Sequence, residues 1–412
     1  MLPTDEAAPV IRRESPEGRQ VLVIPAEDAL LVSVVLPTGT RDRGPDEARA
    51  LELLGRVLPA APVDGEGTGL NAWLARRGAA AEAVIARESV TLRCRMPADG
   101  VAECLPVFLA AIVRPTLTDA LCRAARDESA AAYAATDTAG RRARDRLREL
   151  LFGAHPLGRP SGGAADVPGW QAAALRALYQ DLLAGGAPVL VLAGPETAVP
   201  AALDGLAAGL PPLSADGCRA SRREAPGGEV PSAGGVNLRA EDGGPRARVA
   251  AGGQGPARTD ASAPAFAVLA ELCGASEGSL LRRTLSTDLA VDCSLDAQYV
   301  GYSDSGLVRL ELELATDDVA LTESVLREVL ELLAGGGLQE TALLTAREAA
   351  HARARAEAAD PALGSYRAAM RLIDGEGGDA RSEWAQRLSQ VTAADVARAA
   401  RAVLRTYAVA VV

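Results

Sequence analysis

The sequence is poor in aromatic residues and contains only two histidines. Aromatic side chains make up 3% of its 412 residues, which leaves few rings on which nucleic-acid bases could stack. The formal net charge is −11, from 43 basic against 54 acidic residues, and every basic residue is an arginine. Such a chain would repel a polyanion. Nucleic acid is therefore excluded as an expected partner.

Long apolar runs are also absent. The N-terminus has no hydrophobic core of signal-peptide length, and the longest apolar run, around residues 29–36, is far too short to span a bilayer. The six cysteines are scattered, with neither a CxxC pair nor partner histidines, so they suggest neither a zinc knuckle nor a disulfide framework. We expect a cytoplasmic protein with no membrane contact. Its thiols are expected to be reduced and mostly buried: Cys94, Cys104, Cys122, Cys218, Cys273 and Cys293.

Motifs of several common enzyme classes are missing too. There is no GK[ST] phosphate loop and no GxGxxG that opens a helix after a strand, so nucleotide binding lacks support. Neither histidine lies beside a serine or cysteine in a nucleophile-elbow context, so serine and cysteine hydrolysis lack support too. His155, in GAHPLGRP, is expected to be a loop histidine hydrogen-bonded to backbone, and His351 to lie on the solvated face of a charged helix. Residues 140–150, GRRARDRLREL, have the spacing of an amphipathic, salt-bridged helix.

What the chain does contain predicts two α+β domains, and 412 residues are enough for two. Residues 21–25 (VLVIP) and 30–39 (LLVSVVLPTG) have the composition of two paired strands, and helices and further strands follow to about residue 210. Residues 211–235 are rich in Pro, Gly, Ser and Arg and lack periodicity, which indicates an exposed linker. The predicted domains are therefore residues 1–210 and 236–412, each a mostly antiparallel sheet covered by helices.

The two predicted domains repeat the same order of elements. GTGLNAWLARRGAAAEAV in the first half has the pattern of EGSLLRRTLSTDLAVDCSL in the second. The strand-then-helix stretch SVTLRCRMPADGVAECLPVFLAAIV likewise resembles LVRLELELATDDVALTESVLREVLELL, and both halves end in an apolar strand after a long helix. An internal duplication of about one domain is the simplest explanation.

The order of elements, the duplication, and the phrases HPLGRP and VTAADVARAARAVLRTYAVAVV together resemble the insulinase/pitrilysin-type zinc metallopeptidases. That family includes the mitochondrial processing peptidase and its bacterial relatives, and the resemblance covers almost the whole chain. It implies two homologous α+β halves that form a clam-like half-chamber around an extended peptide. It also implies assembly into dimers of two-domain chains.

The resemblance places a zinc site on the first helix of the first half, where the family carries HxxEH. Two histidines at i and i+4 share one helical face and bind the metal, and the glutamate beside them activates a water. The corresponding residues here are Arg49-Ala50-Leu51-Glu52-Leu53, and Glu128 falls where the distal zinc-binding glutamate is expected. An arginine does not lose its proton and a leucine has no lone pair, so no metal is expected in this chain.

Two readings of the surviving glutamate are open. Glu52 has helical ion-pair spacing to Arg49 and Arg56, which favours an ordinary ion pair over a residual catalytic role. A sharper hypothesis is that Arg49 takes the place of the metal and bridges Glu52 and Glu128, which would keep the site neutral without zinc.

The second half of such peptidases often supplies an arginine and a tyrosine that hold the substrate backbone. In the matching stretch of this chain, residues 285–291, the arginine is replaced by Ser286 and the tyrosine by Val291. Arginines and tyrosines nearby could compensate and bind peptide, although they could equally be surface arginines and strand tyrosines. These candidates are Arg282, Arg283, Tyr299 and Tyr302.

We therefore expect a chain that is no enzyme on its own. The resemblance implies a non-catalytic subunit that pairs with a homologous HxxEH-containing subunit, which alone would carry zinc, and that helps to bind a peptide or precursor-peptide substrate. An alternative is a free-standing peptide-binding or scaffold protein without peptidase activity. An unrecognised enzyme that uses different residues is the third possibility, and it predicts an activity of the isolated chain that survives chelators.

Overall fold

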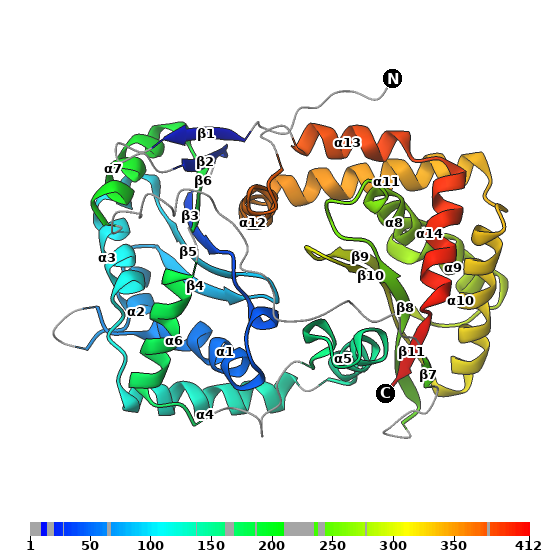
Figure 1. Cartoon of the computed structure of the whole chain (residues 1–412), viewed down its shortest axis with the longest axis horizontal. Coiled ribbons are helices and arrows are strands. Elements are labelled where there is room, and N and C mark those ends of the chain that lie inside the picture. The colour runs from blue at the N-terminus through cyan, green and yellow to red at the C-terminus, as the bar shows by residue number, and fades with distance from the viewer. Residues whose placement is uncertain are drawn as a thin grey trace. The chain divides into compact units, whose positions relative to one another are not determined.

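In a computed structural model, the chain folds into two compact units (Figure 1). The first comprises Met1–Ala134, Gly162–Pro226 and Arg355–Ala380, and the second comprises Ala135–Ser161, Gly227–Ala354 and Arg381–Val412. The structure describes residues 10–14, 20–27, 29–63, 67–136, 138–160, 169–185, 188–209, 235–237, 244–276, 278–376 and 380–412.

The first unit is built on a six-stranded sheet in the order β1-β2-β6-β3-β5-β4. Its only parallel pair is β2 with β6, and the other neighbours are antiparallel. The strands are β1 (Ile11–Glu14), β2 (Gln20–Pro25), β3 (Leu30–Leu36), β4 (Ala80–Ile85), β5 (Val90–Met96) and β6 (Val189–Gly194). The prediction that β2 and β3 pair with each other is wrong, because β6 lies between them.

Helices cover the first sheet on one face. The main core contains Leu30, Val32, Val34 and Leu36 of β3 together with apolar residues from all of these helices. They are α1 (Pro45–Ala60), α2 (Leu70–Ala75), α3 (Val101–Val113), α4 (Asp119–Thr136), α6 (Ala172–Ala184) and α7 (Val199–Gly209). Every residue of β3 is buried, so its opposite face must be covered as well.

The second unit contains a five-stranded sheet in the order β7-β11-β8-β10-β9. The strands are β7 (Gly235–Asn237), β8 (Arg246–Gly255), β9 (Ser294–Gly301), β10 (Gly306–Ala315) and β11 (Ala408–Val411). Its main core lies under α8 (Ala263–Ala270), α9 (Leu280–Arg282), α10 (Val319–Ala334), α11 (Glu340–Ala359), α13 (Ala380–Gln390) and α14 (Ala393–Arg405).

The two sheets have the same topology. The order β2-β6-β3-β5-β4 in the first unit matches β7-β11-β8-β10-β9 in the second, and in both the first pair is parallel and the others are antiparallel. Strand β1 has no counterpart among the described strands of the second sheet. The prediction of two homologous α+β domains with mostly antiparallel sheets is confirmed.

Each sheet takes the cover for its second face from the other half of the sequence. Helix α5 (Ala139–Phe152) follows α4 of the first unit, yet its buried residues Ala143, Leu147, Leu151 and Phe152 belong to one cluster with the second sheet (Figure 1). The residues of the second sheet and its loops in that cluster are Ala250, Tyr302, Leu307, Ala408, Ala410 and Val412.

Helix α12 (Pro361–Ile373) makes the reciprocal contact. It follows α11 of the second unit, but Ala369, Met370 and Ile373 pack against Leu31 and Val35 of β3 and against apolar residues of β2 and β6. Because α5 and α12 occupy the same place in the two repeats, the duplicated units have exchanged one helix each. The units therefore differ from the predicted domains, since residues 135–161 belong to the second unit and 355–380 to the first. Most of the predicted linker lies outside the described residues.

A buried ion pair holds the loop between β3 and α1. The Arg41 side chain is 1% exposed and its Nη1 donates to Oε1 of Glu88, 3% exposed, over 2.9 Å. The same loop is fixed by backbone bonds from the amides of Thr40 and Arg41 to the carbonyls of Ala86 and Arg87. Two charges this deeply buried depend on each other, because either one alone would be desolvated without a partner.

Because α5 packs on the second sheet, a cavity made in α5 is expected to destabilise that sheet. Leu147→Ala is expected to lower the free energy of unfolding by about 2–5 kcal/mol, and to reduce amide hydrogen-exchange protection in β8 and β11. The matched variant is Leu175→Ala in α6, equally buried in the first core. It should reduce protection in β3 and β5 instead. Loss of protection in β3 and β5 on Leu147→Ala would contradict the exchange.

The Arg41–Glu88 pair predicts an unequal response to two similar truncations. Glu88→Ala should lower the free energy of unfolding by about 3–5 kcal/mol, because the buried guanidinium of Arg41 loses the carboxylate that neutralises it. Glu149→Ala removes the partner of Arg146 in an exposed pair of 2.6 Å, and should cost about 0–1 kcal/mol. Urea denaturation of both variants measures the difference, and equal losses would show that burial does not govern the first pair.

Candidate functional site

Helix α1 carries the positions that correspond to the zinc ligands. It begins with Pro45 at its first position and has Asp46 and Glu47 in its first turn, where acidic side chains interact favourably with the helix dipole. Leu53 is 2% exposed and belongs to the main core of the first unit. The Arg49 side chain is 41% exposed, and its Nη1 lies 3.8 Å from Oδ1 of Asp46. The two positions thus carry a core leucine and a half-exposed guanidinium.

The surviving glutamate of this helix has a tyrosine as its partner. The hydroxyl of Tyr133, on α4, donates a short hydrogen bond to Oε2 of Glu52. Sequence reasoning missed Tyr133, which follows Ser129, a residue that only the structure shows to be buried, by four positions and so lies on the same face of α4. The predicted ion pair between Glu52 and Arg49 or Arg56 is not found among the described contacts.

The distal glutamate position belongs to a different contact. Glu128 is 74% exposed, and its Oε1 lies 3.9 Å from Nη1 of Arg56. Glu52 and Glu128 therefore have different partners, Tyr133 and Arg56. The Arg49 side chain lies close to Asp46 on its own helix, and a bridge from Arg49 to the two glutamates stays a prediction.

These residues do not fit a zinc ion. Zinc in proteins is held by thiolates, neutral imidazoles and carboxylates, and a site of one or two carboxylates beside a guanidinium lacks the nitrogen donors of the family motif. Within the described residues, no group of three or more His, Cys, Asp or Glu side chains is placed to hold a metal ion. No catalytic step can be derived through a metal at this position.

The second unit repeats the glutamate at the equivalent place. Pro45 and Glu52 are seven residues apart, as are Pro264 and Glu271, and ELLG after the first proline corresponds to ELCG after the second. Glu271 lies in a π-helical turn (Glu271–Ala275) and its side chain is 4% exposed. Its Oε1 accepts a 2.7 Å hydrogen bond from Nε of Arg353 on α11. The glutamate is therefore a feature of the repeat, bound by a residue of α4 in the first unit and of α11 in the second, and its survival is no sign of catalysis.

Three of the four candidate peptide-binding residues make contacts within the second unit. Nη2 of Arg282 donates to the carbonyl of Leu295 over 2.7 Å. The hydroxyl of Tyr299 donates to the carbonyl of Pro256 over 2.9 Å, and burial raises the pKa of this tyrosine. Tyr302 is buried against α5. Arg283 alone is exposed, and a role for it in peptide binding stays a prediction.

The other positions singled out in the sequence are structural. Val291 is buried, and Ser286 is exposed and hydrogen-bonded to the half-buried Cys293. Nδ1 of His155 accepts from the amide of Leu157 over 3.2 Å, which confirms a loop histidine bound to backbone. His351 is half-buried and its Nε2 is fully buried, so the predicted solvated setting is wrong.

The described cysteines are free thiols, as predicted, and four of the five are buried. Burial raises the pKa of Cys94 and of Cys273 to about 12, so both stay protonated and unreactive at neutral pH. Cys218 lies outside the described residues.

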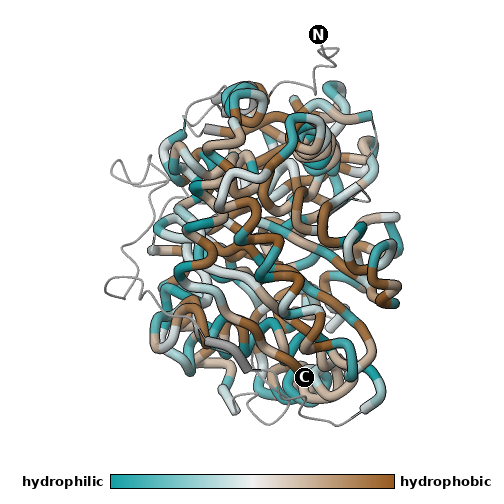
Figure 2. The backbone as a smooth tube through the Cα atoms, turned by 90° about the vertical axis from the view of Figure 1, so that its right-hand side faces the viewer, coloured by the Kyte–Doolittle hydropathy of each residue, from teal (hydrophilic) through white to brown (hydrophobic). Residues whose placement is uncertain are grey.

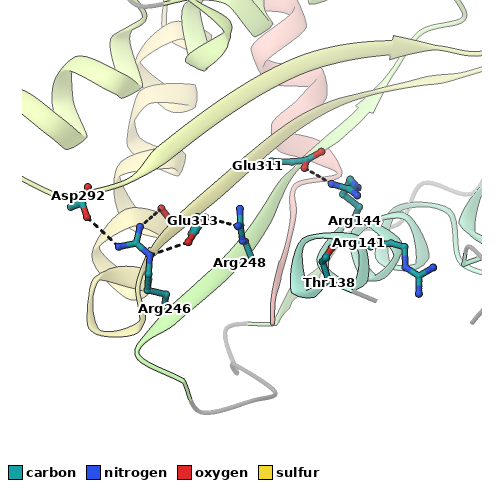
Figure 3. A network of polar contacts seen from close by, with 8 residues as sticks. All are labelled: Thr138, Arg141, Arg144, Arg246, Arg248, Asp292, Glu311 and Glu313. Atoms are coloured by element: carbon teal, nitrogen blue, oxygen red, sulfur yellow. Dashed lines mark hydrogen bonds and ion pairs between the residues drawn. The ribbon is translucent and has the colours of Figure 1, made fainter. Parts of the chain in front are cut away.

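The polar side of α5 joins a network of ion pairs on the second sheet (Figure 3). Nη1 of Arg144 donates to Oε2 of Glu311 over 2.8 Å, and Glu311 also binds Arg309 on its own strand. Arg246 binds Asp292 and Glu313 over 3.1 Å each, and Glu313 also accepts from Arg248. The predicted amphipathic, salt-bridged helix is confirmed.

Helices throughout the chain alternate hydrophobic and hydrophilic residues along their turns (Figure 2). Among the residues that the structure describes, no helix combines the length and the apolar character needed to cross a membrane.

Comparison with known proteins supports the assignment that the motifs suggest. Residues 169–350 match the family model described as the peptidase M16 inactive domain. No curated protein sequence matches the chain.

Solved structures with the same fold cover almost the whole chain. A protease from Helicobacter pylori has a TM-score of 0.82 at 15% identity over 98% of this chain and 99% of that one. A peptidase M16 inactive domain from Pseudomonas fluorescens has a TM-score of 0.80 at 16% identity over 98% and 97%. A chain of complex III2 from Candida albicans, with Inz-5 bound, has a TM-score of 0.78 at 15% identity over 98% and 95%.

The fold, the degenerate helix and the family model agree. Residues 169–350 match the inactive domain of the M16, or insulinase-type, peptidases, and the chain has the fold of M16 structures over almost its whole length, which supports a degenerate, non-catalytic member of that family.

The residues at the former metal position predict a zinc-free chain. After gel filtration in buffer with equimolar zinc, the purified protein should hold far less than one equivalent, because it offers no imidazole at positions 49 and 53. Elemental analysis by mass spectrometry measures the content, and Glu52→Gln and Glu128→Gln should leave it unchanged. One equivalent of zinc that both substitutions remove would contradict the prediction.

Proposed function

We propose that this chain is the non-catalytic subunit of a heterodimeric zinc peptidase, in which a homologous HxxEH-containing chain supplies the metal. The observation that carries the proposal is the contrast at α1. The helix and its neighbours are retained, but the ligand positions hold a core leucine and an arginine, and Glu52 accepts a hydrogen bond from Tyr133. A chain that keeps the whole fold and loses only the metal donors is suited to assist catalysis elsewhere.

The edge of the first sheet supports a role in peptide binding. In the described structure β4 pairs only with β5, so its outer edge is open. The amide of Ala81 donates to Oδ1 of Asn71 over 2.7 Å rather than to β5. Backbone groups alternate between the two edges of an antiparallel strand, so those of Ala83 and Ile85 also point to the open edge. An extended peptide could add there as a further strand.

The open edge lies next to the degenerate helix. A Cβ on Gly55 of α1 would meet Cγ1 of Ile85 at 3.0 Å and the carbonyl oxygen of Ala83 at 3.4 Å, so the glycine permits close packing of the helix on β4. A peptide on β4 would thus pass the position that holds zinc in active relatives. In this chain the peptide would be bound but not cleaved, as expected of a non-catalytic subunit.

Pairing with a homologue is the second element of the proposal. One structure of the same fold is a chain of a larger assembly, complex III2. A duplicated fold offers a partner of the same family a pseudo-symmetric surface. The cofactor of the pair, zinc, would then reside in the partner alone.

Co-expression with a homologue that carries an intact HxxEH tests the proposal. The two chains are expected to co-elute on size exclusion, and cleavage of a quenched fluorescent peptide should be at least about tenfold faster for the pair than for the homologue alone. Equal activity of the homologue without this chain would reject the subunit role. Elution of this chain alone, with peptide bound, would favour the free-standing peptide-binding protein.

Matched substitutions locate the chemistry within the pair. Glu52→Gln in this chain should leave the rate of the pair unchanged, because Glu52 has a structural partner and no metal. Replacement of the glutamate of HxxEH in the homologue by glutamine should abolish cleavage. A large loss of rate with Glu52→Gln, at unchanged co-elution, would assign catalysis to this chain.

A further inference from the structure

The two exchanged helices are attached to their sheets in different ways. Helix α5 inserts large apolar side chains into the cluster on the second sheet, and Leu147 and Leu151 are fully buried there. Directed polar bonds add to these contacts. Nε2 of Gln254 on β8 donates to the carbonyl of Leu151 over 2.6 Å, and the ion pair of Arg144 with Glu311 spans 2.8 Å. Helix α5 is therefore held by apolar packing and by polar bonds together.

Helix α12 presents smaller side chains to the first sheet. Ser365, Ala369 and Ile373 are spaced by four residues, so they lie on one side of the helix, and Ala369 and Ile373 belong to its cluster with the sheet. Ser365 is fully buried on that side, and the residue before it, Gly364, is buried as well. The buried side of α12 thus contains a hydroxyl, an alanine and a glycine beside Met370 and Ile373.

The strand beneath α12 carries a second buried hydroxyl. Ser33 is 1% exposed and lies between Leu31 and Val35 on the face of β3 that α12 covers. In the part of the chain that the structure describes, neither Oγ of Ser33 nor Oγ of Ser365 has a hydrogen-bond partner. Both hydroxyls can bond to water once the helix leaves the sheet, whereas burial without a partner costs each of them that interaction. The contact between α12 and the first sheet therefore contains an unfavourable contribution that separation removes.

Helix α12 is stabilised by its own ends. Oδ1 of Asp360 accepts hydrogen bonds from the amides of Ala362 and Leu363 over 2.8 Å each, and Pro361 occupies the first helical position. Gly375, with φ 80°, follows the last turn. Asp360 is also the single residue between α11 and α12. The helix can thus keep its form when it moves about this junction.

We infer that α12 is a lid that detaches from the first sheet as a unit while the rest of the first unit stays folded. The apolar residues that it covers on β2, β3 and β6 form a cluster separate from the main core under the other helices of that unit. Opening of the lid therefore leaves the main core intact and exposes an apolar strip on three neighbouring strands. Helix α5, with its polar bonds, stays on the second sheet. The inference does not depend on the proposed subunit role.

Cysteine labelling tests the inference. Ser365→Cys and Ser33→Cys place a thiol on each side of the contact, and Ala143→Cys places one on α5, where Ala143 is 1% exposed. Iodoacetamide is added to each folded full-length variant without denaturant, and mass spectrometry of the digested protein gives the rate at each site. Positions 365 and 33 should react at rates within about threefold of each other, and at least about tenfold faster than position 143, because local opening needs less free energy than global unfolding.

Two outcomes of the labelling would overturn the inference. If positions 365 and 143 react equally slowly, α12 opens only when the protein unfolds. If position 365 reacts but position 33 does not, the helix distorts without leaving the sheet. Native-state hydrogen exchange gives the same comparison in the unsubstituted chain. The amides of α12 should exchange at least about tenfold faster than those of α5, and equal rates would likewise reject the lid.

Removal of the hydroxyls tests the cause. In the double variant Ser33→Ala with Ser365→Ala, exchange of the α12 amides should slow by at least about fivefold, because the closed state no longer buries hydroxyls without partners. Exchange in α5 should stay unchanged. The matched control is Ser129→Ala on α4, since the buried hydroxyl of Ser129 donates to the carbonyl of Ala125 over 2.7 Å and its loss should not affect α12. Unchanged or faster exchange of α12 in the double variant would show that the hydroxyls do not weaken the contact, and the inference would then be wrong.

Discussion

Each sheet of this protein has buried apolar residues on both faces, and that constraint shapes the rest of the molecule. In the first sheet, successive residues of β3 point to opposite sides and all are buried, so one layer of helices cannot cover both faces of the strand. The second cover comes from α12, and α5 does the same for the second sheet. Neither unit has a complete core unless the other half of the sequence contributes a helix. Strand β4 pairs only with β5 in the described structure, and its other edge is the surface on which the functional proposal rests.

The sequence predicts which helices and strands form better than it predicts which of them pack or pair with one another. Periodicity identifies α5 as an amphipathic helix, because its leucines and arginines fall on opposite sides, and the duplicated order predicts a repeated α+β unit. The pattern does not say which sheet the apolar side will meet, so the exchange of α5 and α12 could not be read from it. The strand β6 between β2 and β3 is a similar case, because local composition marks strands and leaves their order undetermined.

At the candidate site, the missing metal donors could be read from the sequence, but the contacts of the remaining residues could not. Positions 49 and 53 hold an arginine and a leucine, neither of which supplies a nitrogen lone pair, so the sequence predicts that no zinc is bound there. The partners of the survivors depend on how α4 packs, and spacing along one helix pointed to Arg49 and Arg56 where the structure has Tyr133. The common spacing of Pro45–Glu52 and Pro264–Glu271 was legible in the sequence. Likewise Tyr299 and Tyr302 were plausible as surface residues until the sheet and α5 buried them.

The reciprocal exchange has a consequence for how such a chain arose. A single ancestral repeat would have left one apolar sheet face without a helix of its own, and exposed apolar surface of that kind favours association. Two copies could have covered each other's apolar sheet face by exchanging this helix about a twofold axis, as in a domain-swapped dimer. Gene fusion would then have joined partners that already depended on one another. Once they were joined, either copy of the edge strand was free to diverge.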